Sequence, residues 1–165
     1  MSQIYFVSFD KEGRIYTVNA LDSTMLASHP DHKQGLQRIL LLNAKGEPDT
    51  NLYRQIELHA GQRHYVENGK TIKPKQLVKI ALDKTMLKPD GADVATISWT
   101  APEPIQMFCN GRLKGKFMNS LKITSKKAGL YYRIEVDDPK YYSEVPLWLR
   151  TQEMEQSTLP SSTSP

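Results

Sequence analysis

The stretch LKPDGADVATI, residues 87–97, joins a turn to a strand-like run. Asp90 and Gly91 predict a tight turn, because glycine tolerates positive φ and aspartate accepts hydrogen bonds from nearby backbone amides. Asp93 is placed to accept such bonds as the next strand begins. A calcium site is the alternative interpretation, but such sites need about six to eight oxygen ligands and no further acidic residues follow at the required spacing. We therefore interpret the stretch as a turn that opens a strand with one buried face, on which Ala95 and Ile97 lie.

The same alternation of strand-like runs and turn residues continues to residue 149. About seven short strands, separated by Gly, Pro, Asn or Asp, are typical of a β-sandwich. The Asn110-Gly111 step predicts one of its tight hairpins. We expect strands near residues 78–82, 94–99, 105–109, 112–117, 121–124, 130–136 and 144–149. The side chains expected in the core are Ala95, Ile97, Trp99, Ile105, Met107, Cys109, Leu121, Ile123, Leu130, Tyr132, Ile134 and Val136.

The preceding residues, 1–75, predict a small β-rich region made of hairpins. Residues 4–9 and 14–18 are rich in aromatic and β-branched side chains and flank a turn, Asp-Lys-Glu-Gly, which is a hairpin pattern. Asn68-Gly69 predicts a second hairpin, because the favoured two-residue turn needs positive φ at both positions. Alternation over residues 53–58 favours a half-buried strand, whereas residues 36–42 fit either a short helix or a buried strand.

Composition excludes several classes of protein. No run of about 18 apolar residues could span a bilayer, and the first residues do not resemble a secretory signal, so we expect a soluble protein made in the cytoplasm. The only cysteine, Cys109, precludes an internal disulfide and is expected to be a buried apolar residue. The net charge of +4 is spread along the chain, so we expect no nucleic-acid partner.

No residue pattern predicts catalysis, a metal or a cofactor. His29, His32, His59 and His64 are the histidines, and zinc would require three or four of them, or equivalent ligands, in one place. There is no Ser/His/Asp arrangement, nucleophile elbow or phosphate-binding glycine loop. We therefore expect a protein that is not an enzyme and binds neither metal nor cofactor.

Two surfaces are candidates for binding. Residues 141–149 place large aromatics near the end of the chain, and we select Trp148, Tyr141 and Tyr142 as interaction residues, although Trp148 could equally cap the core. The second candidate is a basic face with aromatic neighbours, which could instead be a solvated face with lysines at strand edges. Its residues are Arg112, Lys114, Lys116, Lys122, Lys126 and Lys127, with Phe108, Phe117 and Tyr131.

Three motifs carry a resemblance to small tail proteins of tailed bacteriophages that end in a bacterial immunoglobulin-like domain. These are the hairpin at residues 5–15, the element YVENGKTI at 65–72, and the Asp-Gly-x-Asp-x-Ala-x-Ile pattern at 90–97. Their order matches across most of the chain. The stretch KAGLYYRI at 127–134 resembles a tyrosine corner, with Tyr131 favoured by spacing and Tyr132 by alternation. The absence of a cysteine pair excludes an antibody-type domain.

The resemblance implies a domain organisation and a function. We expect a β-rich docking region at 1–75, an immunoglobulin-like sandwich at 76–150 and a flexible Ser/Thr/Pro-rich tail at 151–165. The expected function is a structural or accessory component of the tail, at the baseplate or tail-fibre junction in the virion. Its partners would be other tail proteins or further copies of itself. The alternatives are a tail assembly chaperone absent from the virion and a module that binds a host-surface polysaccharide.

Overall fold

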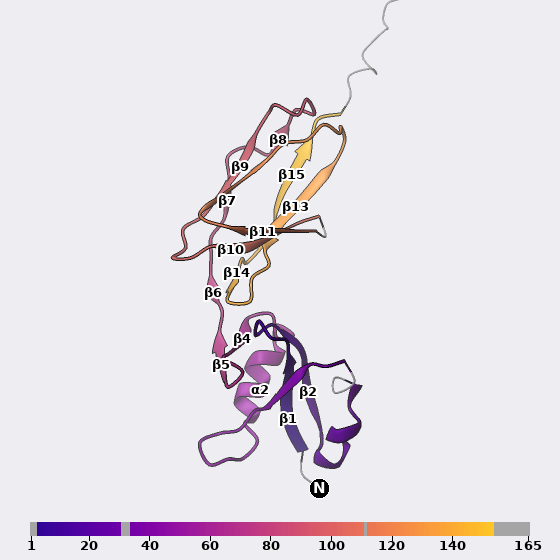
Figure 1. The fold of residues 1–165 in the computed structure, drawn as a ribbon, viewed down its shortest axis with the longest axis vertical. Helices are drawn as coiled ribbons and strands as arrows, with labels where there is room; N and C mark the ends of the chain where they lie inside the picture. The colour runs from indigo at the N-terminus through magenta and orange to yellow at the C-terminus, as the bar shows by residue number, and fades with distance from the viewer. Residues whose placement is uncertain (1–2, 31–33, 111, 154–165) are drawn as a thin grey trace, which may run out of the picture. The chain divides into compact units, whose positions relative to one another are not determined.

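The computed structural model describes residues 3–30, 34–110 and 112–153, and the chain forms two compact units, Met1–Gln76 and Leu77–Pro165 (Figure 1). Both units are built mainly from strands arranged in several sheets. The prediction of an all-β fold is therefore confirmed. The immunoglobulin-like sandwich remains a prediction.

A three-stranded antiparallel sheet forms the centre of the first unit. Its strands are β1 (Gln3–Phe9), β2 (Ile15–Asp22) and β3 (Gln37–Leu40), in the order β2-β1-β3. The predicted hairpin joins β1 to β2, and Asp10 Oδ1 accepts hydrogen bonds from the amides of Glu12 and Arg14 at 2.9 and 3.0 Å. Of the two structures left open for residues 36–42, a strand is observed over Gln37–Leu40, but its side chains are half-buried or exposed and not buried as expected.

The strand expected at residues 53–58 is wrong, because α2 (Thr50–Glu57) is a helix. Asp49 caps it, with Oδ1 accepting a hydrogen bond from Leu52 N at 3.0 Å. Leu52, Tyr53 and Ile56 share one helical face and pack into the core of the unit. The alternation that predicted a strand rested on Ile56 and Leu58, but Leu58 is exposed, and the aspartate cap was the signal that favoured a helix. A 3₁₀ helix, η1 (Ser23–Ser28), follows β2.

The second predicted hairpin is confirmed by β4 (His64–Glu67) and β5 (Thr71–Pro74). Asn68 and Gly69 in its turn have φ values of 53° and 70°, as the Asn-Gly pattern requires. The core of this unit is one apolar cluster to which the sheet, the helix and β4 contribute. Its buried members are Val7, Phe9, Ile15, Leu41, Ile56 and Val66.

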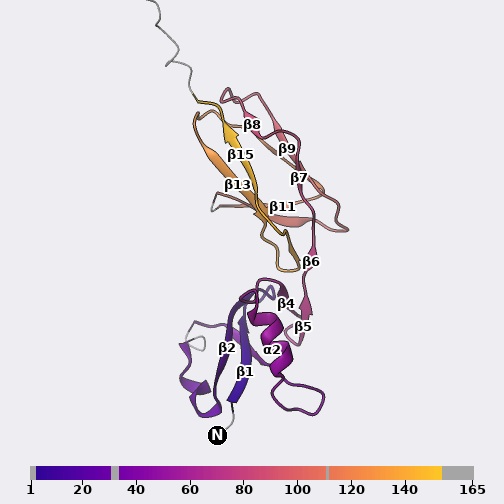
Figure 2. The ribbon, with the colours of Figure 1, turned by 180° about the vertical axis from the view of Figure 1, so that it is seen from behind.

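Two larger sheets form the second unit. One has the strand order β11-β10-β13-β15-β8, in which only the β15–β8 pair is parallel, and the other has the order β12-β9-β7. Strands β13 and β15 lie side by side in both views (Figure 1, Figure 2). The strands are β6 (Gln76–Leu77), β7 (Ala81–Leu82), β8 (Met86–Leu87), β9 (Ala95–Ser98), β10 (Ile105–Cys109), β11 (Arg112–Phe117), β12 (Ser120–Ile123), β13 (Tyr131–Val136), β14 (Tyr141–Tyr142) and β15 (Leu147–Thr151), with β6 paired to β14.

A single apolar cluster takes side chains from both large sheets. Nine of its members were expected from alternation: Ala95, Ile97, Trp99, Ile105, Met107, Cys109, Leu121, Ile123 and Ile134. Of the other expected core residues, Tyr132 and Val136 are half-buried and pack against the cluster, whereas Leu130 is half-buried outside it. Leu87 and Leu149 complete the centre of the cluster and are fully buried.

Three expectations for this unit need correction. The segment expected to form one strand at 78–82 pairs with two different strands. Val78 bonds to Tyr142 of β14, whereas residues 81–82 form β7 and pair with β9. The short strand β8 was not expected. The boundary expected at residue 151 is wrong, because Thr151 is buried in β15 and exchanges hydrogen bonds with Leu130. The rest of that expected tail, 154–165, lies outside the described residues.

The Asp90-Gly91 turn has the predicted chemistry. Asp90 Oδ1 accepts hydrogen bonds from the amides of Ala92 and Asp93, and Gly91 has a φ of 76°. Asp93 accepts bonds from Lys88 N and from Lys84 Nζ, both at 2.8 Å. These donors lower the pKa of both carboxyl groups. The same hydrogen bonds hold the segment that leads into β9.

Candidate interaction surface

The outward side of β13 and β15 exposes two aromatic and two basic side chains. Alternation turns Ile134 and Leu149 into the core and leaves the neighbouring positions on the opposite face. In the ladder, Arg133 lies opposite Trp148 and Tyr131 lies opposite Arg150. The aromatic and basic residues therefore occupy alternate corners of a square on the sheet. We call Tyr131, Arg133, Trp148 and Arg150 the aromatic–arginine face.

The two aromatic side chains of this face are open to solvent. Tyr131 is 61% exposed and Trp148 is 55% exposed, which is unusual for residues of their size. Arg133 pairs with Glu135 at 3.1 Å, whereas Arg150 has no ion pair within the part of the chain that is described. The face thus offers flat apolar surface beside one arginine that is available to an acidic or hydrogen-bond-accepting group.

The three residues selected from the sequence do not lie on one surface. Trp148 is exposed on β15, so it does not cap the core, and its role in interaction stays a prediction. Tyr141 is 7% exposed and belongs to the core of the second unit. Tyr142 is half-buried, and its carbonyl accepts a hydrogen bond from Val78 N at 2.8 Å. Arginines 133 and 150 were not selected, because only the strand register places them beside Trp148.

The residues expected to form a basic face lie on several elements. Lys116 and Lys122 lie on β11 and β12, which belong to different sheets. Phe117 packs against the core, and Tyr131 belongs to the aromatic–arginine face. Lys126 and Lys127 instead line a separate hollow beside Tyr132.

Of the two tyrosines considered for a tyrosine corner, Tyr132 makes a side-chain hydrogen bond to a residue upstream. Its hydroxyl donates to Ser125 Oγ at 3.0 Å, and Ser125 Oγ in turn accepts a bond from Lys127 N. Tyr131, the candidate that spacing favoured, points to solvent. The hydroxyl therefore reaches upstream backbone through a serine side chain, which is a variation on the usual direct bond.

The histidines are dispersed. His29 lies edge-on to the buried Phe6 ring, with the ring centres 5.1 Å apart, and His59 is exposed. His64 is half-buried. Its pKa is lowered mainly by desolvation and, to a smaller extent, by repulsion from His59. His32 lies outside the described residues. Among the residues that are described, no three potential ligands gather in a way that could hold a metal ion.

An arginine that sequence reasoning did not single out organises the η1 side of the first unit. The guanidinium of Arg38 lies 5.3 Å from the centre of the Phe6 ring. It donates to the carbonyls of Leu26 and His29 at 2.7 and 2.8 Å. Arg38 thus holds the segment after β2 over one face of the sheet, so its role is structural.

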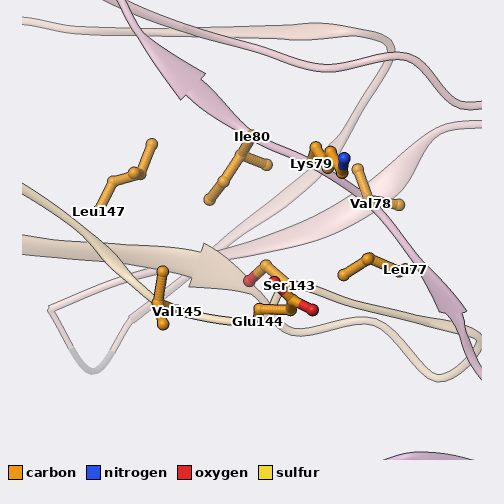
Figure 3. A pocket seen from close by; sticks show the side chains of 8 residues that line it. All are labelled: Leu77, Val78, Lys79, Ile80, Ser143, Glu144, Val145 and Leu147. Atoms are coloured by element: carbon orange, nitrogen blue, oxygen red, sulfur yellow. The ribbon is translucent and has the colours of Figure 1, made fainter.

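An apolar hollow of about 250 Å³ lies in the second unit, between the segments 77–80 and 143–147. Val78 and Ile80 on one segment and Val145 and Leu147 on the other line opposite sides of it (Figure 3). Val145 is 67% exposed at its rim. Lys79, Ser143 and Glu144 add polar groups to its lining, so the hollow combines apolar contact with a few polar side chains.

Among the described residues, no helix is both long and apolar enough to cross a membrane. Neither the protein-family models nor the curated proteins yield a match to this chain.

Proposed function

We propose that the chain is a non-enzymatic structural or accessory component of a bacteriophage tail, which acts by docking to other tail proteins. The order of three sequence motifs supports the assignment to the tail. The observation that carries the docking function is the aromatic–arginine face. Trp, Tyr and Arg are the residue types most enriched where protein interfaces derive their binding energy.

The exposed area of Trp148 sets the expected strength of this contact. A side chain of this kind buries about 150–250 Å² in a complete interface. Since 55% of Trp148 is exposed, docking would remove about 80–140 Å² from water, or about 2–3.5 kcal/mol at ~25 cal/mol per Å². A truncation to alanine should therefore weaken docking by about 30- to 300-fold.

The test uses particles of a phage that encodes the chain. Mass spectrometry of purified virions should detect the protein, and its absence would favour the assembly chaperone instead. Tail particles that lack the protein should take up the purified native chain. Their affinity for Trp148→Ala should be lower by at least about 30-fold. Met118→Ala, which removes another side chain that is 50% exposed, is the matched control and should dock normally. Equal docking by both variants would exclude the aromatic–arginine face as the docking surface.

A host-surface polysaccharide is a second candidate partner, favoured by the same exposed aromatics. Trp148 and Tyr131 could stack on sugar rings, and Arg150, which has no ion pair with any described residue, could pair with an acidic sugar. Titration of tryptophan fluorescence with host-surface polysaccharide should then change the emission of the native chain but not that of Trp148→Ala. No change in the native chain would remove this candidate.

A further inference from the structure

The outer edge of β2 lacks the residues that normally prevent strands from pairing between molecules. Exposed edges are usually protected by a charge, a proline or short length. Residues 15–21 of β2 contain neither a charged residue nor a proline. The other described edge strands are protected. Among them, β3 is only four residues long, β4 has Glu67, β5 has Lys73 and Pro74, β11 has Lys116, β12 has Lys122, and β6, β7, β8 and β14 have only two residues each.

The backbone groups of this edge point away from the sheet at alternate residues. Leu41 N donates to Tyr5 O at 2.9 Å, so Tyr5 and, by alternation, Val7 bond toward β3. Their partners on β2 are Ala20 and Val18. The N–H and C=O groups of Ala20 and Val18 therefore face outward, on the side where the described chain places no further strand.

The open part of the edge is limited to residues 17–22. At its beginning, Arg14 forms a bridge with Tyr65 of β4, which occupies that end. Tyr16 is an extra residue in the ladder, because Ser8 pairs with Thr17 whereas Phe9 pairs with Ile15. Beyond this bulge the strand is regular as far as Asp22, so a short added strand has a continuous ladder to join.

We propose that this edge of β2 pairs antiparallel with the same edge of a second copy of the chain. Residues whose backbone N–H and C=O groups face outward must lie opposite each other in the two copies. The register with Asn19 on the two-fold axis meets this condition, because it places Val18 opposite the partner's Ala20. The open edge is neutral up to Asp22. Antiparallel pairing also brings the Asp22 end of each copy toward the Arg14 end of the other, so opposite charges approach. The occupant that fits both the neutral edge and its charged ends is the chain itself.

Sedimentation or light scattering of the purified full chain should therefore give a dimer. Ala20→Pro removes an outward N–H and leaves the β1 ladder intact, so it should weaken the dimer at least about tenfold. Leu40→Pro makes the matched change on the outer edge of β3 and should leave the dimer unchanged. Circular dichroism should show both variants folded. A monomeric native chain, or a dimer that Ala20→Pro leaves intact, would overturn the proposal.

A cysteine substitution tests the register directly. Residues opposite each other in a non-hydrogen-bonded pair have Cα atoms about 4.5 Å apart, within the range that a disulfide spans. Asn19→Cys should form a disulfide-linked dimer under mild oxidation, whereas Thr17→Cys should not. The native Cys109 is 2% exposed and should not interfere. Absence of the Asn19→Cys crosslink would refute the pairing. Trp148→Ala lies in the other unit and should leave the dimer intact, so this proposal and the docking function can fail separately.

Discussion

Leu149→Ala gives the sharpest test of the core of the second unit. Leu149 lies in β15 opposite Tyr132, and its side chain is fully buried in the cluster shared by the two large sheets. Removing three carbons there should cost about 2–5 kcal/mol, because the lost burial is compounded by a cavity that the rigid sheets cannot fill. With a urea dependence of about 1 kcal/mol per M for a domain of this size, the unfolding midpoint should fall by about 2 M or more.

Tryptophan fluorescence is the appropriate assay, because both tryptophans, Trp99 and Trp148, belong to the second unit. Val145→Ala, at a position that is 67% exposed, is the control and should change the stability by no more than about 0.5 kcal/mol. Ile56→Ala removes a fully buried side chain of the first unit and should leave the tryptophan transition unchanged. A midpoint shift below about 0.5 M for Leu149→Ala would refute the packing argument.

Three further changes test local features. Tyr132→Phe should cost about 0.5–1.5 kcal/mol in the tryptophan transition through loss of one hydrogen bond, whereas Tyr131→Phe should be neutral; equal effects would contradict the corner assignment. Asp49→Ala should destabilise the first unit by about 1 kcal/mol through loss of the α2 cap, and Asp49→Asn should retain most of the stability. Far-UV circular dichroism during unfolding measures both effects. Folding lowers the pKa of His64 and so disfavours its charged form. The stability of the first unit should therefore fall as the pH drops below about 6.5, the unfolded value, and through the folded pKa; His64→Gln should flatten that part of the profile in thermal melts.

Several parts of the fold could be predicted because their cause is local. The turns at Asp90-Gly91 and Asn68-Gly69 depend on positive φ and on hydrogen bonds to neighbouring amides, which the residues themselves supply. The buried faces of β9 and β10 follow from alternation of residue type, which reflects the geometry of a single strand. Helix α2 was mistaken for a strand, because a run of six residues is too short for the alternation of Ile56 and Leu58 to distinguish the two periods.

The sequence by itself therefore determined that the chain is mainly β, where its hairpin turns lie and most of the residues that fill its second core. Only the tertiary structure decided which strands become neighbours. Strand pairing between distant segments places Arg133 beside Trp148, buries Tyr141, assigns β11 and β12 to different sheets and leaves the edge of β2 open. These features are properties of register and sheet order, and no short stretch of residues carries that information.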